Sequence, residues 1–268
     1  MADGRGSELA GRIEYDPPQA SVTLSLGGSL VEAKTGISGG LGGGPRGLVT
    51  GFSSAARRRL MRFIASLERD VRPIFVTLTY PDVFDDSHAK WKRDIDVFGK
   101  RLKRQFEGAG FVWRIEFKER QTGKGAGRVA PHYHLLVYGA PYRRLLAWIK
   151  DNWWEVVGSN DADHYLAGTA VEKIYSYGGV MRYVGKYIAK EDSYPDDWQG
   201  KAWGVVGRSR LPFAVKVVIS LTEQEAIKLI RLGRKMIKAK GRSFTFGLTW
   251  IVNAERVLDY LEWCMGFT

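Results

Sequence analysis

Two strand-like segments, residues 111–117 and 132–138, constrain the fold of this 268-residue chain more than any other feature. In the first segment the large apolar residues share one face, while Arg114 and Glu116 share the other. Only a glycine-rich turn at 121–127 connects the two segments, which leaves no room for a helix. The segments are therefore predicted to pair as antiparallel neighbours in one sheet.

Helices and strands alternate along the rest of the chain. Apolar residues at helical spacing predict helices at 54–69, 88–106, 142–154, 181–190, from 222 to about 240, and 253–263. β-Branched and aromatic runs predict further strands at 74–79, 169–174, 203–206, 213–219 and 244–251. This order favours an α+β fold, with a central antiparallel sheet and helices packed mainly on one face.

Glycine and charge divide the chain into three expected parts. Thirteen of the 32 glycines fall within the first 51 residues. We expect a glycine-rich segment at 1–50, either flexible or forming a hairpin around Gly27-Gly28. A folded domain is expected at 51–220. A basic helical extension at 221–268 is expected to pack on the same body.

The charge balance points to a phosphate-bearing partner. The chain has 41 Lys and Arg against 29 Asp and Glu, and its formal net charge is +12. The excess lies outside residues 1–56, which hold four basic and five acidic residues. Binding to phosphates would release counterions. No apolar run approaches membrane-spanning length and no signal peptide is evident, so we expect a cytoplasmic protein with no membrane partner.

Two histidines and a carboxylate form the strongest candidate site. His132 and His134 are two residues apart on a strand and point to the same face. Glu116 faces them in one register of the predicted pair, and Glu119 is the alternative. Two imidazoles and a carboxylate leave coordination positions open, and they suit Mn²⁺ or Mg²⁺ that contacts a phosphate oxygen. Two unrelated histidines and an ordinary ion pair of Glu116 are the plainer interpretation.

Two tyrosines form the second candidate. Tyr183 and Tyr187 are four residues apart on a predicted helix and share one face. Lys186 and Lys190 each follow a tyrosine by three residues. A tyrosine becomes a good nucleophile only when its proton is removed or its charge is neutralised, and nearby cations favour both. Such a pair is also common in ordinary helix packing.

Three motifs, taken together, resemble the HUH endonuclease superfamily. They are residues 75–81 (FVTLTYP), 131–137 (PHYHLLV) and 183–190 (YVGKYIAK), which follow one another in the family's order. The similarity is narrower to the rolling-circle replication initiators of phages and plasmids that carry two tyrosines. It extends over roughly 50–215, because residues 203–212 resemble the terminal segment of those initiators. The resemblance implies an RRM-like or ferredoxin-like HUH palm in the 51–220 domain.

The resemblance also implies roles for individual residues. It makes His132 and His134 metal ligands, with Glu116 as the third ligand. It aligns Tyr187 with the single nucleophile of plasmid-type initiators and Tyr183 with the second nucleophile of two-tyrosine phage initiators. The lysines at 186 and 190 match those that accompany the family's tyrosines.

The activity implied by the resemblance is metal-dependent nicking of single-stranded DNA at a replication origin, where a hairpin is an option. The product is a 5′-phosphotyrosine and a free 3′-OH, and the strand is later rejoined. The chain has no Walker motif, so a host helicase and a DNA polymerase are the expected partners.

Three other functions fit part of the sequence. A single-strand DNA transposase shares the same chemistry. A non-catalytic RRM-like nucleic-acid-binding module explains the charge and the aromatic residues, but gives no reason for the histidine pair. A metal-dependent hydrolase would form no covalent intermediate with DNA. A relaxase is disfavoured, because relaxases usually carry the tyrosine ahead of the histidines.

Overall fold

The computed structural model describes residues 20–35, 51–180, 184, 194–196, 198, 200–236, 248–251 and 254–265. In chain order its elements are β1 (Ala20–Leu26), β2 (Leu30–Thr35), α1 (Ser54–Ala65), β3 (Ile74–Thr79), α2 (His88–Gln105), β4 (Gly110–Glu119), β5 (Val129–Tyr138), α3 (Tyr142–Val157), α4 (Ala162–Ala167), β6 (Thr169–Lys173), β7 (Trp203–Val206), η1 (Arg208–Arg210), β8 (Val215–Leu221), α6 (Glu223–Met236), β9 (Leu248–Ile251) and α7 (Ala254–Met265).

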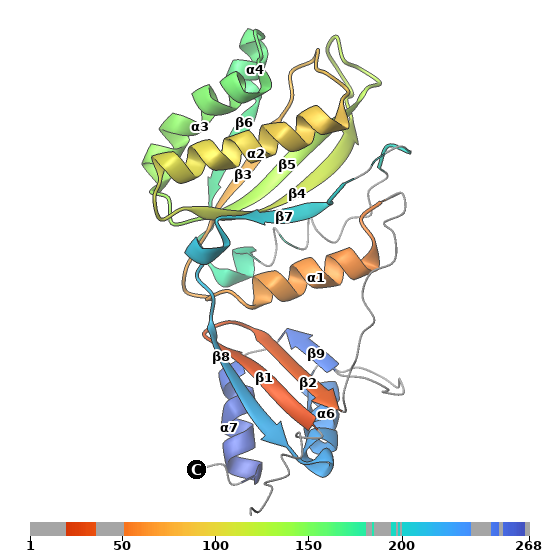
Figure 1. The fold of residues 1–268 in the computed structure, drawn as a ribbon, viewed down its shortest axis with the longest axis vertical. Helices are drawn as coiled ribbons and strands as arrows, with labels where there is room; N and C mark the ends of the chain where they lie inside the picture. The colour runs from red at the N-terminus through yellow and green to blue at the C-terminus, as the bar shows by residue number, and fades with distance from the viewer. Residues whose placement is uncertain are drawn as a thin grey trace, which may run out of the picture.

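A five-stranded sheet forms the larger half of the molecule (Figure 1). Its strand order is β6-β3-β5-β4-β7, and every neighbouring pair is antiparallel. The chain order β3-α2-β4-β5-α3-β6 gives the split βαβ arrangement of ferredoxin-like folds, with β7 added at one edge. The predicted α+β class and the predicted antiparallel pair of β4 and β5 are both confirmed.

Helices α2 and α3 cover one face of this sheet with an aromatic core. Ser87 caps α2 by accepting a hydrogen bond from the Lys90 backbone N–H. The Phe98 ring of α2 meets Phe111 of β4 and Trp153 of α3 edge-on, with ring centroids 6.0 and 5.8 Å apart. These large side chains are fully buried, so they fix the sheet and both helices as one layer pair.

Helix α1 lies alone on the opposite face (Figure 1). Ser53 caps it by accepting from the Ala56 backbone N–H. Its buried residues Leu60 and Ile64 lie near Phe75, Val112 and Leu136 of the sheet. Of the described helices that contact this sheet, most therefore lie on one face, as predicted.

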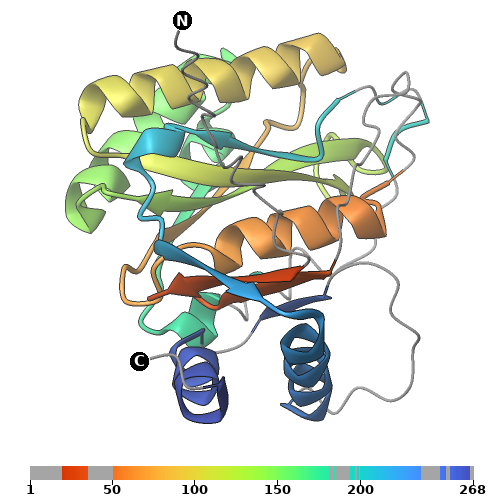
Figure 2. The ribbon, with the colours of Figure 1, turned by 60° about the horizontal axis from the view of Figure 1, so that its bottom comes forward.

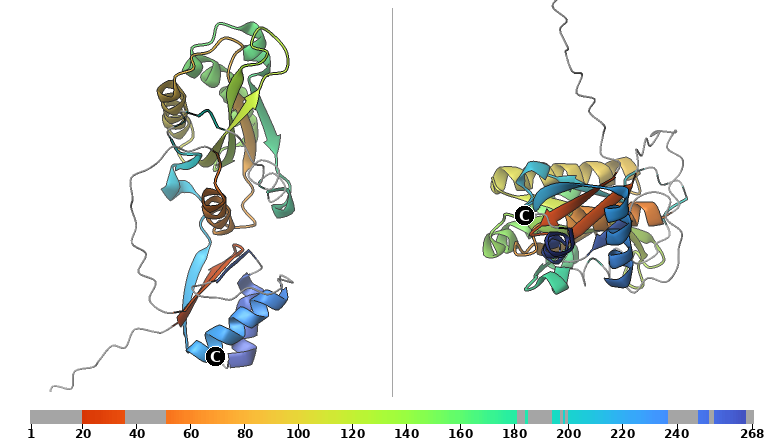
Figure 3. Two further views of the ribbon diagram at one scale, coloured as in Figure 1. Left: turned by 90° about the vertical axis from the view of Figure 1, so that its right-hand side faces the viewer. Right: turned by 90° about the horizontal axis from the view of Figure 1, so that it is seen from below.

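A second sheet, of order β8-β1-β2-β9, lies beyond α1 and carries α6 and α7 on its far side (Figures 2 and 3). Val22, Leu24, Val31, Leu229 and Leu261 belong to its separate buried core. The hairpin of β1 and β2 comes from the glycine-rich N-terminal part, whereas β8, β9 and both helices come from the C-terminal part. The boundary drawn from the sequence at residue 220 falls within β8.

The turn of the β1–β2 hairpin joins this second sheet to α1. Gly27 adopts a positive φ of 85°, which other residues rarely tolerate. The Ser29 backbone N–H donates to the Ala65 carbonyl at 2.8 Å, and the Arg69 backbone N–H donates to the Gly27 carbonyl at 2.8 Å. In the part of the chain that the structure describes, no helix is long and apolar enough to cross a membrane.

The aromatic core yields a stability prediction. Phe98→Ala should lower the free energy of unfolding by about 3–5 kcal/mol, because it leaves a cavity between three large rings. Urea unfolding measures the change. Val83→Ala is the control, since Val83 is 74% exposed and its truncation should change stability by no more than about 0.5 kcal/mol. Equal midpoints for both variants would contradict the packing described.

Candidate functional site

The register of three strands brings the histidines and Glu116 together. His132 of β5 pairs with Glu116 of β4 on one side and with Thr79 of β3 on the other. His134 pairs with Arg114 and Thr77 in the next row that faces the same way. Because side chains alternate along a strand, all six lie on the face that α1 partly covers.

His134 is held on three sides. Its Nε2 lies 2.7 Å from Glu116 Oε2, and its Nδ1 lies 3.2 Å from Thr77 Oγ1. The imidazole also stacks on the Phe75 ring, with centroids 5.7 Å apart and planes 12° from parallel. The His134 and Glu116 side chains are each only 9% exposed. Thr77 and Phe75 therefore orient the ring and direct Nε2 towards the carboxylate.

His132 lies in an environment that keeps it neutral. Burial lowers its pKa from 6.5 to about 4, and the neighbouring His134 acts in the same direction, while Glu116 acts in the opposite one. A neutral imidazole offers the lone pair that a metal ion requires. This histidine is thus available as a ligand at neutral pH without first losing a proton.

Glu116 and Glu119 occupy opposite faces of β4. Glu116 is buried beside the histidines, whereas Glu119 is exposed and pairs with Val129 near the end of the hairpin. The two residues are three apart, so alternation along the strand alone separates them. Of the two carboxylates, only Glu116 is positioned to share a ligand with His132 and His134.

The donor set of this site fits a divalent metal in chemical kind, with two imidazoles and one carboxylate on one face. Within the described ranges, no three His, Cys, Asp or Glu side chains are arranged around a common point that would hold a metal ion. Glu116 Oε2 and His134 Nε2 instead share a hydrogen bond. A metal bound here would replace that contact.

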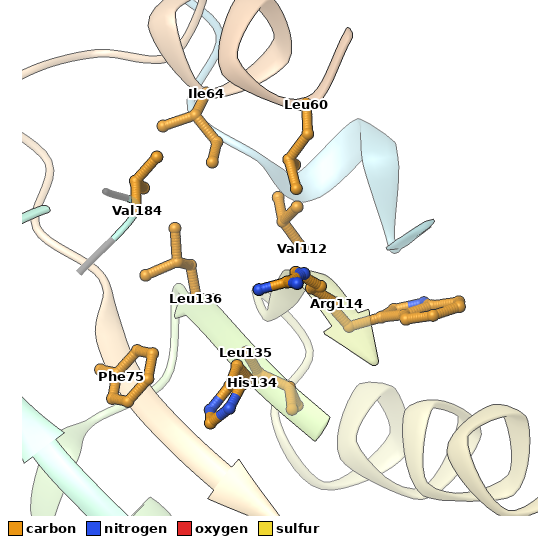
Figure 4. Close-up of a pocket in the computed structure, with 10 residues that line it drawn as sticks. Leu60, Ile64, Phe75, Val112, Arg114, His134, Leu135, Leu136 and Val184 are labelled. Atoms are coloured by element: carbon orange, nitrogen blue, oxygen red, sulfur yellow. The ribbon is translucent and has the colours of Figure 1, made fainter. Parts of the chain in front are cut away.

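His134 also borders a pocket beneath α1 (Figure 4). Its lining is mostly apolar and includes Leu60, Ile64, Leu136 and Val184. Val184 is buried and is the only described residue between Tyr183 and Tyr187. The candidate residues Tyr183, Lys186, Tyr187 and Lys190 all lie outside the described residues, as does the predicted helix 181–190 except for Val184.

Arg114 is the one cationic side chain among the residues that line this pocket. It is only 2% exposed, and its guanidinium lies 4.6 Å from the centre of the Phe52 ring. Figure 4 shows the guanidinium pointing into the pocket near Val112 and Leu136. The sequence analysis assigned Arg114 no role, although it alternates with Glu116 on the polar side of β4. Such a buried cation lies next to the histidine pair and favours anions nearby.

Comparison with known proteins gives one match. Residues 73–192 match the family model of the replication-associated protein ORF2. The matched range begins at β3, contains Glu116 and both histidines, and ends after the two tyrosines. No curated protein and no solved structure matches the chain. The match supports a role in replication.

The lowered pKa of His132 can be measured directly. In the metal-free protein, imidazole ¹⁵N chemical shifts should report a pKa of about 4 for His132, assigned by comparison with His132→Gln. The folded protein binds this proton more weakly than the unfolded chain does. Stability should therefore fall as the pH drops from about 6.5 to about 4, and His132→Gln should lack this part of the slope. A measured pKa near 6.5 would contradict the buried environment.

Proposed function

We propose that this protein is a two-tyrosine initiator of rolling-circle replication, of the HUH type, that nicks and rejoins single-stranded origin DNA. One observation carries the proposal. Within the range that matches the replication-associated family, β4 and β5 bring Glu116, His132 and His134 together, and the pocket beside them is lined by Val184, which lies between the two tyrosines.

Under this proposal His132, His134 and Glu116 hold a divalent ion, Mn²⁺ or Mg²⁺. The ion would polarise the scissile phosphate when bound. The chain's own residues prepare the site, because His132 stays neutral and Thr77 with Phe75 fixes the orientation of His134. Arg114 adds positive charge from inside the neighbouring pocket.

Tyr187 is the proposed first nucleophile. Its phenol oxygen attacks the phosphorus of the scissile phosphodiester, and a bond forms between them while the bond to the 3′ oxygen breaks. The phenol proton leaves, and the departing 3′ oxygen gains one and becomes a free hydroxyl. The product is a 5′-phosphotyrosine. The new phosphodiester conserves the energy of the old one, so a later attack by a 3′-OH rejoins the strand.

Tyr183 is the proposed second nucleophile, and Lys186 and Lys190 are proposed to offset the negative charge that develops during the attack. With a second tyrosine, the protein could cut again and transfer the strand without water as a nucleophile. The net charge of +12 supports attraction to the DNA backbone. A host helicase and a host DNA polymerase would unwind the duplex and extend the 3′-OH.

A non-catalytic RRM-like module explains these features less well. Such modules bind unpaired bases on an open sheet face. Here Leu60 and Ile64 of α1 are buried in the core that this helix forms with the corresponding face of the sheet. The most polar part of that face carries the histidines and Glu116, which contribute no stacking surface for bases. A single-strand transposase would use the same residues and remains the alternative within the same chemistry.

Covalent attachment tests the proposal. With Mn²⁺ and a pool of labelled single-stranded oligonucleotides, the wild-type protein should form an adduct that survives a denaturing gel, and Tyr187→Phe should form at least roughly 100-fold less, on the order of a lost nucleophile. Tyr175→Phe is the matched control, because Tyr175 is 80% exposed and lies outside the site. Metal-dependent cleavage without any adduct would indicate a hydrolase instead.

The two tyrosines should behave differently. Tyr183→Phe should retain the first cleavage and adduct, because Tyr187 remains, but it should transfer the bound strand to a second cleaved end poorly. A strand-transfer assay with two oligonucleotides of different lengths measures both steps. Loss of the first cleavage in Tyr183→Phe, together with normal cleavage by Tyr187→Phe, would reverse the assigned roles.

A further inference from the structure

A second pocket lies at the end of β3, beside the row that contains Glu116, His132 and Thr79. Its walls include Tyr80, Asp82 and Arg120 on one side and Asp161, Asp163 and His164 on the other. We propose that this pocket binds a nucleobase that carries an exocyclic amino group, from the nucleotide next to the scissile phosphate. The inference rests on the proposed function, since it assigns part of the DNA sequence preference to this pocket.

The pocket adjoins the candidate metal site through Thr79. Thr79 lines the pocket and is also the cross-strand partner of His132. Neighbouring strands lie about 5 Å apart. Burial is the main cause of the lowered pKa of both His132 and His164, and the charge of Arg120 lowers both further, so it acts on both sites. A strand whose phosphate lies at His132 would therefore have an adjacent base within reach of this pocket.

The first wall has no spare positive charge for a phosphate. Arg120 donates to Asp82 Oδ1 at 2.7 Å, to the Pro81 carbonyl at 2.8 Å and to the Tyr80 carbonyl. The second oxygen of Asp82 accepts from the Lys124 backbone N–H at 2.9 Å. These bonds hold the β4–β5 turn against the end of β3 and neutralise the guanidinium locally.

The second wall presents hydrogen-bond acceptors. His164 Nε2 donates to the Thr79 carbonyl at 2.8 Å, which leaves Nδ1 as the acceptor nitrogen. Burial lowers the pKa of His164, and its Nδ1 has no hydrogen-bond partner among the described residues. The carboxylate of Asp163 lies at the exposed rim, and Asp161 is oriented by the backbone N–H groups of Asp163 and His164.

This distribution of groups selects the class of ligand. Three carboxylates face one guanidinium and a neutral histidine, so the pocket repels phosphate. The acceptors at Asp163 and His164 match donors on a base edge. Guanine, adenine and cytosine each carry an amino group, whereas thymine does not. Thymine should therefore be the base that this pocket disfavours.

A binding selection tests the inference without any cleavage. The full-length protein is incubated in EDTA with randomised single-stranded oligonucleotides, and the bound sequences are read. The wild-type protein should deplete thymine at one position by roughly fivefold to tenfold, as expected for a hydrogen-bonded base contact. Asp163→Asn, which removes an acceptor, and Ala167→Phe, which fills the pocket from its exposed rim, should both reduce that depletion to less than about twofold.

Asp70→Asn is the matched control, because Asp70 is exposed and precedes β3 at its opposite end. It should keep the wild-type base profile. Nick mapping in Mn²⁺ should then place the affected position next to the cleaved phosphate. An unchanged profile in both pocket variants, or a change at a position away from the nick, would overturn the pocket assignment while adduct formation leaves the proposed function intact. If the wild-type protein binds no single-stranded DNA and forms no adduct, both the inference and the proposed function fall.

Discussion

The antiparallel register of β5 between β3 and β4 is the constraint on which the candidate site depends. It sets Thr79, His132 and Glu116 in one row and Thr77, His134 and Arg114 in the next row on that face. A shift by one residue would turn both histidines towards the face that α2 and α3 fill with aromatic rings. Burial of Tyr133 and Leu135 on that face therefore holds the register and, with it, the histidine pair.

The layers on either side of the sheet restrict how this site can move. On one face, Trp153 and Phe98 are buried and join α3, α2 and the sheet. On the other, α1 closes the pocket that contains Arg114, and the second sheet contacts α1 through its hairpin turn. The Ser29 hydroxyl of that turn hydrogen-bonds the Tyr177 hydroxyl. Tyr177 belongs to a short helical stretch at 177–180 that precedes Val184. The second sheet thus contacts the approach to the two tyrosines, which favours a preorganised site over a loose one.

Local patterns were sufficient for most of the larger sheet. Alternation and helical spacing predicted β3, β4, β5, α2 and α3 to within a few residues, because each element buries one periodic face. The six-residue helix α4 was missed, since it is too short to show a period. The second sheet could not be predicted because its pairs join segments about 190 residues apart, such as Val22 with Ile219. No local pattern specifies such a partner.

The site shows the same division. The spacing of His132 and His134 predicted their shared face, and strand alternation is enough to separate Glu116 from Glu119 once the strand is known. The burial of Arg114 could not be foreseen, because charged side chains are almost never fully buried unless they are paired. The acceptor-lined pocket at Asp163 and His164 depends on how α4 packs at the end of β3, and this packing is set by tertiary contacts such as the bond from His164 to Thr79.

The most direct test of the central claim is to locate the DNA on the protein. After nuclease digestion of the adduct, trypsin cuts after Arg182, Lys186 and Lys190 and releases Tyr183 and Tyr187 on separate peptides. Mass spectrometry should find a nucleotide phosphate on the 187–190 peptide after the first cleavage. A nucleotide on a peptide outside 183–190, or DNA cleavage that leaves no peptide modified, would contradict a tyrosine nucleophile in this segment.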